Sequence, residues 1–368
     1  MPTDRLTRIQ NALEDSSLDA IALLPGMNLL YLTGLSFHLM ERPVIALFLR
    51  GDRPRIILPE LEESKLDSLE APVAAFPYGE DVASRQKAFL DAFAAFAGST
   101  ASIGVEPYRM RFFEMHLMKQ AAPAISIIDA SDLLIDLRLM KTETEVEAMQ
   151  RAVHAAETAL ENTLAGARVG MTEKEFEAEL TLQLFRAGSE PELPFAPIVA
   201  SGPNSALPHA TPTARAFQHG DLLIVDWGAR VDGYISDITR TFAIGKPDEE
   251  LGQIHRVVQA ANRAGREQVR PGVTCGSADD AARAVIVDAG YGAEFVHRTG
   301  HGIGMDAHEP PYISAGNTRL MAPGMAFTIE PGIYLRGKGG VRIEDNVIVT
   351  EEGHRCLTTI SRQIRSIG

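Results

Sequence analysis

The feature that most constrains the fold of this chain is a set of four acidic residues set inside strand-like runs of apolar residues. Asp226 ends the run Leu-Leu-Ile-Val, and Asp237 follows Tyr-Ile-Ser. Glu330 follows Ala-Phe-Thr-Ile, and Glu344 lies within Val-Arg-Ile-Glu-Asp-Asn-Val-Ile-Val. A buried, ionised carboxylate is costly unless a proton or a cation compensates its charge. We therefore expect a fold that brings these acids to a shared compensating charge.

A turn signal indicates how the first two acids are arranged. Asp232-Gly233 is the strongest short sequence signal for a two-residue β-hairpin. A turn there pairs Asp226 with Thr239 and makes Asp237 a diagonal neighbour of Asp226 on the same face of the sheet. Two carboxylates in that relation repel each other unless a proton or a cation lies between them.

The second pair of acids repeats this arrangement and adds a histidine. A hairpin symmetric about Gly337 places Glu330 opposite Glu344. His301 lies in the glycine-rich segment Thr-Gly-His-Gly-Ile-Gly, where little side-chain bulk obstructs a ligand. One imidazole with four carboxylates suits Mn²⁺, Co²⁺, Fe²⁺ or Zn²⁺. Two ions with bridging carboxylates leave room for a reacting water, as in two-metal hydrolases.

Each of these residues also has a simpler interpretation when it is taken alone. Asp226 and Asp237 could be turn or edge residues, and Glu330 could be a strand-end acid paired with Arg342. His301 could be an ordinary loop residue, and seven further histidines are interpreted as surface or packing residues: His38, His116, His154, His219, His255, His297 and His354. The joint pattern of Asp, Asp, His, Glu and Glu favours the metal site.

The rest of the chain predicts two domains. Up to about residue 135, β-like runs alternate with helical patterns, which is typical of an α/β domain. The strands are expected at Ala20–Leu24, Val44–Leu49, Arg55–Leu58, Val73–Phe76, Ile103–Val105 and Ile125–Ile128, and the helices at Arg5–Glu14, Glu60–Leu69, Val82–Ala97 and Phe112–Gln120. Asn28–Gly34 is expected to be a further strand that enters a loop, Leu35–Pro43.

The second half has the mixed pattern of an α+β domain with antiparallel hairpins. Thr142, three residues before Glu145, matches a capping box at the start of a long helix. Further helices are expected at Glu173–Ala187, Glu249–Val269 and Ser277–Ala289, and strands at Leu222–Trp227, Tyr234–Phe242, Ala326–Ile329 and Val341–Val349. The boundary is expected between 130 and 142, which gives domains 1–135 and 140–368.

Composition excludes several classes of function. The 368 residues carry a formal net charge of −14, which disfavours binding to nucleic acid. No apolar run approaches the roughly 20 residues of a membrane helix, and the charged N-terminus lacks a signal-peptide core. With only Cys275 and Cys356, the chain offers neither a disulfide framework nor a thiolate zinc site. We expect a cytoplasmic protein that binds neither membranes nor nucleic acid.

The ordered set Asp226, Asp237, His301, Glu330 and Glu344 resembles the metal-ligand set of the pita-bread metallopeptidases, which include methionine aminopeptidase, aminopeptidase P and prolidase. Three motifs carry the resemblance: Val-Asp-Trp-Gly…Ser-Asp-Ile-Thr-Arg-Thr, Gly-His-Gly-Ile-Gly-Met-Asp-Ala-His-Glu, and Thr-Ile-Glu-Pro-Gly…Gly-Val-Arg-Ile-Glu-Asp. The N-terminal half resembles the creatinase-like domain of prolidase and aminopeptidase P, a domain that methionine aminopeptidases generally lack.

The resemblance implies a role for each ligand. Asp226 would chelate one ion, Asp237 and Glu344 would bridge two ions, and His301 and Glu330 would complete the site of the other ion. Manganese is the first expectation for both divalent ions, with cobalt, zinc or iron as alternatives. The resemblance also implies a homodimer and a small peptide substrate with proline at the second position.

Further roles follow from the same resemblance. Glu330 would accept the proton of the attacking water and pass it towards the leaving imino nitrogen. His209 and His308 would hydrogen-bond the substrate and stabilise the tetrahedral oxyanion. Arg342, counted among the substrate-site residues, would orient the bridging carboxylates.

One departure from the family pattern bears on specificity. Prolidases often carry an arginine in a His-Glu-x-Pro-Arg context to hold the substrate carboxylate, whereas Tyr312 occupies that place here. Arg319 and Arg42 are candidate replacements. Arg42 would reach the site of a partner subunit on the loop Leu35–Pro43, whose apolar residues Phe37, Leu39 and Met40 look exposed.

The expected activity is therefore hydrolysis of Xaa-Pro bonds, with a dipeptidase favoured over an aminopeptidase P. A creatinase-like C–N hydrolase and an inactive binding module on the same fold are the alternatives. Both are disfavoured because all five ligands, His209 and His308 are present.

Overall fold

A computed structural model describes residues 3–69 and 71–368. The chain divides into two compact units, Met1–Leu137 and Arg138–Gly368. The predicted succession of an α/β domain and an α+β domain is confirmed. Among the described residues, no helix combines the length and the apolar character needed to cross a bilayer.

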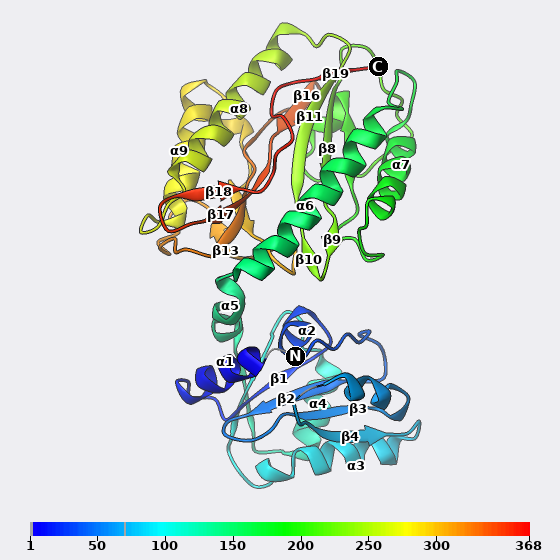
Figure 1. Ribbon diagram of the computed structural model, residues 1–368, viewed down its shortest axis with the longest axis vertical. Coiled ribbons are helices and arrows are strands. Elements are labelled where there is room, and N and C mark those ends of the chain that lie inside the picture. The colour runs from blue at the N-terminus through cyan, green and yellow to red at the C-terminus, as the bar shows by residue number, and fades with distance from the viewer. Residues whose placement is uncertain (1–2, 70) are drawn as a thin grey trace. The chain divides into compact units, whose positions relative to one another are not determined.

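The first unit is a six-stranded mixed sheet in the order β4-β3-β2-β1-β5-β6. The strands are β1 (Ala20–Leu23), β2 (Ile45–Leu49), β3 (Arg55–Pro59), β4 (Ala74–Tyr78), β5 (Ser102–Val105) and β6 (Ser126–Asp129). The helices are α1 (Thr3–Glu14), α2 (Met27–Thr33), the 3₁₀ helix η1 (Glu60–Ser68), α3 (Val82–Ala92), the 3₁₀ turn η2 (Ala94–Phe96) and α4 (Phe112–Ala121). Helices α3 and α4 pack on one face of the sheet through a common apolar core, and α1 and α2 cover the other face (Figure 1).

Two predictions in this unit were wrong in the type of element. The segment Asn28–Gly34, expected to be a strand, is the helix α2 and its C-terminal cap. A short apolar run does not distinguish a buried strand from a helix, and Gly34, in the left-handed conformation at φ 73°, is the helix-stop signal that decides it. The segment Glu60–Leu69 forms a 3₁₀ helix rather than an α-helix.

The second unit begins within α5 (Ser131–Leu139), and its strands lie between two pairs of helices. The helices are α6 (Glu143–Leu164), α7 (Glu173–Arg186), η3 (Gly202–Ala206), α8 (Glu249–Gln268), α9 (Cys275–Asp288) and η4 (Gly292–Glu294). The strands are β7 (Ile198–Ser201), β8 (Leu222–Trp227), β9 (Arg230–Val231), β10 (Tyr234–Ile235), β11 (Ile238–Ile244), β12 (Gly300–Gly302), β13 (Glu309–Ile313), β14 (Ala326–Ile329), β15 (Gly332–Leu335), β16 (Gly339–Arg342), β17 (Asp345–Val349), β18 (His354–Cys356) and β19 (Ser366–Ile367).

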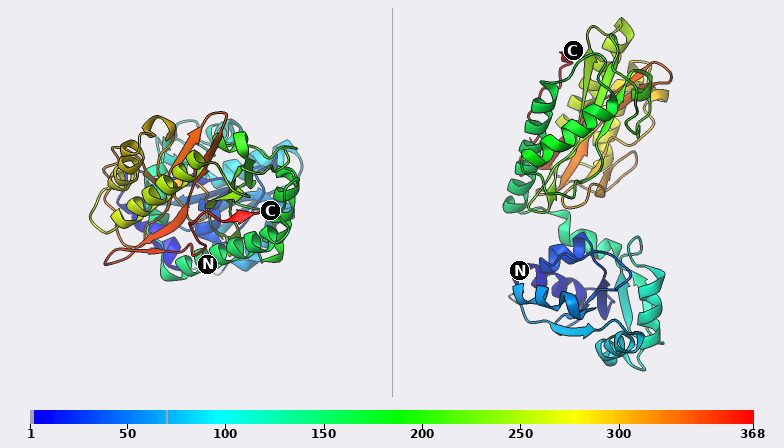
Figure 2. Two further views of the ribbon diagram at one scale, coloured as in Figure 1. Left: turned by 90° about the horizontal axis from the view of Figure 1, so that it is seen from above. Right: turned by 90° about the vertical axis from the view of Figure 1, so that its right-hand side faces the viewer.

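These strands form a four-stranded sheet, β19-β11-β8-β7, a five-stranded sheet, β13-β12-β14-β17-β18, and two short ribbons. Helices α8 and α9 lie on one side of them and α6 and α7 on the other (Figures 1 and 2). The capping box predicted at the start of α6 is confirmed, with Thr142 and Glu145 bonding each other's backbone N–H groups. The indole of Trp227 fixes α6 to β8 by donating to the carbonyl of Ala156 at 2.8 Å.

The predicted hairpin register is confirmed at the first pair of acids. Asp232 and Gly233 both adopt left-handed φ angles, 52° and 77°, as a two-residue turn of this type requires. Asp226 pairs with Thr239 across β8 and β11, as the turn position implies.

The register around the second pair of acids also follows the prediction. Strands β14 and β17 pair Ile329 with Asp345, and the ribbon β15–β16 continues the same register, symmetric about Gly337. Glu330 therefore lies opposite Glu344, at the point where the hairpin passes from one sheet to the other.

Two strands that were predicted to be continuous are broken at acidic residues. Tyr234–Phe242 divides into β10 and β11 at Asp237, and Val341–Val349 divides into β16 and β17 at Glu344. The backbone explains both breaks, because these residues bond across to other strands. The N–H of Asp237 donates to the side chain of Asn346, and the N–H of Glu344 donates to the carbonyl of Thr239.

Candidate metal centre

The five residues predicted to be metal ligands come from five separate places in the chain and line one cavity of about 580 Å³. Asp226 lies near the end of β8, Asp237 lies between β10 and β11, and His301 is the centre of β12. Glu330 directly follows β14, and Glu344 lies between β16 and β17. The two hairpins and the short strand β12 thus bring all four acids and the imidazole to one site.

Three of these residues form the tightest group. Ligand atoms of Asp237, His301 and Glu344 all lie within 4.8 Å of one another. The Nε2 atom of His301 lies 3.6 Å from Oδ2 of Asp237 and 3.4 Å from Oε1 of Glu330. Ligand bonds of about 2.0–2.2 Å to a single ion produce ligand-to-ligand separations of this size.

The charges of the site are mutually unfavourable in the protein alone. Burial, followed by repulsion from neighbouring carboxylates, raises the pKa of Asp237 and of Glu344 well above the usual range. Burial also raises the pKa of Glu330 to about 7. Burial, with a smaller contribution from His308, lowers the pKa of the His301 imidazole to about 3. A bound cation reverses this electrostatic balance because it stabilises the carboxylates and accepts the neutral imidazole as a ligand.

Two unpaired oxygens show where such a cation fits. Among the described residues, Oδ1 of Asp226 and Oε1 of Glu344 are buried without a hydrogen-bond partner. The other oxygen of each carboxylate is occupied, since Arg342 donates to Oδ2 of Asp226 and Thr239 donates to Oε2 of Glu344, both at 2.7 Å. Buried polar atoms rarely remain unsatisfied, so carboxylates held by one oxygen with the other free fit a divalent cation well.

Arg342 is held beside Asp226 by several hydrogen bonds. Besides Asp226, its guanidinium donates to the hydroxyl of Thr239, the hydroxyl of Tyr334 and the carbonyl of Pro208, at 2.9 to 3.1 Å. We expected Arg342 to orient the carboxylates that bridge the ions. Its direct carboxylate partner is instead Asp226, the residue expected to chelate one ion, and it reaches Glu344 only through Thr239.

Both histidines expected to contact the substrate line the same cavity. The His308 ring lies 4.1 Å from the His301 ring, centre to centre. His209 directly follows Pro208, and both histidines belong to the cavity wall. Burial, and then the positive charge of Arg298, lowers the pKa of His308. A neutral His308 can accept or donate a hydrogen bond to a peptide substrate.

The glutamate of the His-Glu motif is structural. Glu309 is only 7% exposed, and its two oxygens accept from Arg138 and from Nζ of Lys141, the latter at 2.6 Å. This buried ion cluster ties β13 to the end of α5 and to Lys141, which lies between α5 and α6, and thereby fixes the segment that carries His308.

The cations proposed to replace the family arginine lie elsewhere. Tyr312 and Arg319 are not among the described residues that line the cavity. Arg42 lies in the first unit, where its guanidinium pairs with Glu80 at 3.0 Å and with Glu41 at 3.7 Å. Phe37, expected to be exposed on the same loop, is 9% exposed, because it packs inward beneath the ammonium of Lys65.

Sequence reasoning missed two polar residues of the cavity wall. His297 was expected to be a surface or packing residue, yet its Nε2 lies 2.8 Å from the hydroxyl of Tyr334, which in turn accepts from Arg342. Arg298 adds a second guanidinium to the lining. Their position immediately before Thr-Gly-His301 is the only sequence signal that could have indicated them. No sequence feature indicated the apolar residues of the cavity wall, which include Phe195.

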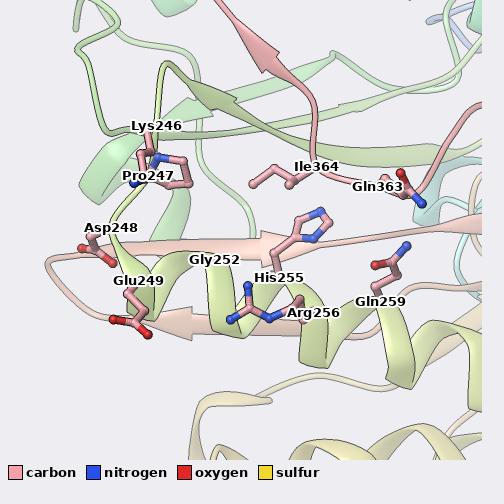
Figure 3. A pocket seen from close by; sticks show the side chains of 10 residues that line it. All are labelled: Lys246, Pro247, Asp248, Glu249, Gly252, His255, Arg256, Gln259, Gln363 and Ile364. Carbon is pink, nitrogen blue, oxygen red and sulfur yellow. The ribbon is translucent and has the colours of Figure 1, made fainter.

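A second hollow lies at the start of α8 and shares no residue with this centre. Figure 3 shows its lining side chains: Lys246, Pro247, Asp248, Glu249, Gly252, His255, Arg256, Gln259, Gln363 and Ile364. Burial, and then nearby arginines, lowers the pKa of His255 to about 4. The mixed charges of this surface bring no group of metal ligands together.

Comparison with known proteins places both units. Residues 147–351 match the family model described as Metallopeptidase family M24, and residues 5–140 match the Creatinase/Prolidase N-terminal domain. The probable dipeptidase PepE of Mycobacterium tuberculosis strain H37Rv is 38% identical over 95% of this chain and 92% of its own length. The Xaa-Pro dipeptidase of Pyrococcus furiosus is 32% identical over 98% and 99%. The crystal structure of a recombinant prolidase from Thermococcus sibiricus superposes with a TM-score of 0.93 at 32% identity, covering 99% of this chain and 98% of the other.

Proposed function

The chain belongs to metallopeptidase family M24, and from that premise we propose that it is an Xaa-Pro dipeptidase, a hydrolase of dipeptides whose second residue is proline. The observation that carries the proposal is that four carboxylates and one imidazole line one cavity, where one oxygen of Asp226 and one of Glu344 have no hydrogen-bond partner among the described residues. Relatives that match over nearly the full chain and are named dipeptidases support the same activity.

We assign two divalent cations to this centre, with manganese first and cobalt, zinc or iron as alternatives. The ligands would be Asp226, Asp237, His301, Glu330 and Glu344, with Asp237 and Glu344 shared between the ions. When bound, such cations polarise the scissile carbonyl group and activate a water for attack. The buried donor set and its free oxygens support this assignment.

The remaining residues bind the peptide and move protons. The Glu330 carboxylate takes the proton of the attacking water and delivers it to the departing proline nitrogen. His209 and His308 donate hydrogen bonds to the substrate and to the developing oxyanion, which contributes most where water is excluded. Arg342 keeps Asp226 in one orientation, and Tyr334 fixes the guanidinium of Arg342 in turn.

A second candidate activity, an aminopeptidase P that acts on longer Xaa-Pro-Yaa peptides, is favoured by one observation. Tyr312 stands where prolidases often carry the arginine that holds the substrate carboxylate. An aminopeptidase has no need of that cation, because the chain of its substrate continues beyond proline. The creatinase-like hydrolase and the inactive binding module have no comparable observation in their favour.

Hydrolysis of a small peptide panel tests the proposal. Purified protein loaded with Mn²⁺, Co²⁺ or Zn²⁺ is assayed with Ala-Pro, Met-Pro and a tripeptide Xaa-Pro-Yaa. A dipeptidase cleaves the two dipeptides and spares the tripeptide, whereas cleavage of the tripeptide alone establishes an aminopeptidase. No metal-dependent cleavage of any of the three peptides would refute the proposed function.

The proposal also covers features that rest on the family resemblance. We take the domains to extend over 1–135 and 140–368, the protein to be a cytoplasmic homodimer, and the loop Leu35–Pro43 to cap the cavity of the partner. In that arrangement Arg42 would exchange Glu80 for the substrate carboxylate. Size-exclusion chromatography with light scattering tests the dimer, and the kinetics of Arg42→Ala test the loop.

A further inference from the structure

Two arginines belong to the wall of the metal-site cavity, and they differ in how their donors are used. Arg342 is 3% exposed and bonds a carboxylate, two hydroxyls and a carbonyl. Its guanidinium is therefore a fixed part of the site that holds Asp226. It has little capacity left for a substrate.

Arg298 is the opposite case. Within residues 3–69 and 71–368, no carboxylate pairs with its guanidinium and no hydrogen bond from its side chain is found. Its guanidinium carbon lies 4.3 Å from the ring centre of Tyr312. A guanidinium over an aromatic face is held by its flat side, so the N–H groups along its edge remain free to donate.

The charge of Arg298 acts inside the cavity. Arg298 and His308 both belong to the lining of the cavity that holds the proposed metal ligands. Because the guanidinium is positively charged and has no ion-pair partner among the described residues, it suits an anionic group of a ligand bound in this cavity.

We propose that Arg298, held flat by Tyr312, binds the C-terminal carboxylate of the substrate and so restricts the enzyme to dipeptides. The inference rests on the proposed function and names its specificity device. A guanidinium and a carboxylate can form two parallel hydrogen bonds. These bonds fix the position of the substrate's proline residue and neutralise the charge of its carboxylate. Tyr312 thus does not remove the cation from the site, but supplies the aromatic surface on which a cation from the segment before β12 is presented. Tyr312 is a positioning residue, and Arg298 is the residue that contacts the substrate.

The kinetic test compares Met-Pro with its C-terminal amide. Charge-assisted hydrogen bonds are worth enough that Arg298→Ala should lower the ratio of kcat/KM for the acid over the amide about tenfold to a hundredfold, mainly through KM. Tyr312→Ala should lower the same ratio by a smaller factor, and Tyr312→Phe should restore it because the ring face is kept. Arg263→Ala serves as the matched control, since Arg263 is an exposed residue of α8 whose guanidinium pairs with Glu267. Arg263→Ala should leave the ratio unchanged.

A binding measurement separates this inference from the proposed function. Calorimetric titration of the Mn²⁺-loaded protein with L-proline and with L-prolinamide should show a preference for proline that Arg298→Ala abolishes. If wild-type protein cleaves no peptide yet keeps this preference, the proposed function fails and the assignment of Arg298 stands. An equal loss of acid and amide hydrolysis in Arg298→Ala, or a preference for the acid that only Arg42→Ala removes, would overturn the assignment.

Discussion

Replacement of Glu344 by glutamine should stabilise the metal-free protein, although ordinary substitutions at a residue 1% exposed destabilise. In the metal-free protein the Oε1 atom of Glu344 has no hydrogen-bond partner among the described residues, and its carboxylate is repelled by Glu330 and Asp226. Glutamine keeps the acceptor that Thr239 uses and replaces the repelled oxygen with an amide donor. An unsatisfied buried acceptor costs about 1–3 kcal/mol, so we expect a gain of about 2 kcal/mol in the free energy of unfolding.

Bound metal should reverse the order of stability, so that wild type becomes more stable than Glu344→Gln. A ligand that binds only the folded state at a hundredfold excess over its Kd adds about 2.7 kcal/mol. Wild type should gain this in Mn²⁺, and Glu344→Gln should gain less because it lacks a carboxylate proposed to be shared by both ions. Urea unfolding followed by tryptophan fluorescence, with chelator and then with Mn²⁺, measures both effects, since Trp227 is buried in β8 beside Asp226.

The pH dependence of the free energy of unfolding provides a second test of this prediction. A carboxyl whose pKa is raised on folding binds more protons in the folded than in the unfolded chain. The free energy of unfolding of metal-free wild type should therefore rise as pH falls through the folded pKa of the acids, which is about 7 for Glu330. The advantage of Glu344→Gln should shrink over the same range. A variant less stable than wild type in chelator at neutral pH would refute the reasoning, because the acids would then not be under electrostatic strain.

Four further substitutions test other parts of the structure. His209→Ala and His308→Ala should retain bound metal, as measured by elemental analysis. Each should lower kcat about 10²- to 10³-fold, since an oxyanion contact is worth about 2.7–4 kcal/mol. Loss of the metal in either variant would show that the residue is a ligand instead. His255→Asn should flatten the pH dependence of stability between pH 6.5 and about 4. In wild type, burial lowers the pKa of His255, so the unfolded chain binds more protons than the folded chain in this range and stability is lost as pH falls. That difference is at most about 3 kcal/mol, and identical urea midpoints for variant and wild type across the window would contradict it. Glu309→Gln should cost about 3 kcal/mol in chemical denaturation, since Arg138 and Lys141 would be left as buried cations with a weakened partner; a loss below about 1 kcal/mol would show that the cluster is not needed.

The arrangement of the acids could be predicted because local turn chemistry sets it. Asp232-Gly233 accepts the two left-handed conformations of a tight turn, and the position of the turn alone decides that Asp226 faces Thr239. In a β-ladder a shift of one residue would turn every side chain to the other face, so a fixed turn fixes the face as well. The predicted register of the second hairpin, symmetric about Gly337, is correct for the same reason.

The parts that sequence did not predict depend on contacts between distant segments. The contact between Arg298 and Tyr312 arises because β12 pairs with β13, which places the ring of Tyr312 against the guanidinium. Nothing in the residues around position 298 indicates that pairing. The strand breaks at Asp237 and Glu344 have a similar origin, since their backbone groups bond to side chains and carbonyls of other strands.

The helix α2 shows a different limit. Met27–Thr33 is short and almost entirely apolar, so a helical and an extended arrangement bury it equally well. Only Gly34, which ends the helix in a left-handed conformation, separates the two, and a glycine is also common after a strand. The misassigned segment lies in the first unit and leaves the predicted metal centre unaffected.

The central claim is that the four acids of the cavity and His301 hold two divalent cations that the proposed peptidase activity requires. Asp237→Asn tests it most directly, because Asp237 is the acid proposed to be shared by both ions and belongs to the tightest group of ligand atoms. Metal content per chain, measured by elemental analysis after dialysis against Mn²⁺, is compared with the rate of Met-Pro hydrolysis. We predict two ions per wild-type chain, and fewer ions with almost no turnover in Asp237→Asn. Full activity in metal-free Asp237→Asn protein would contradict the claim.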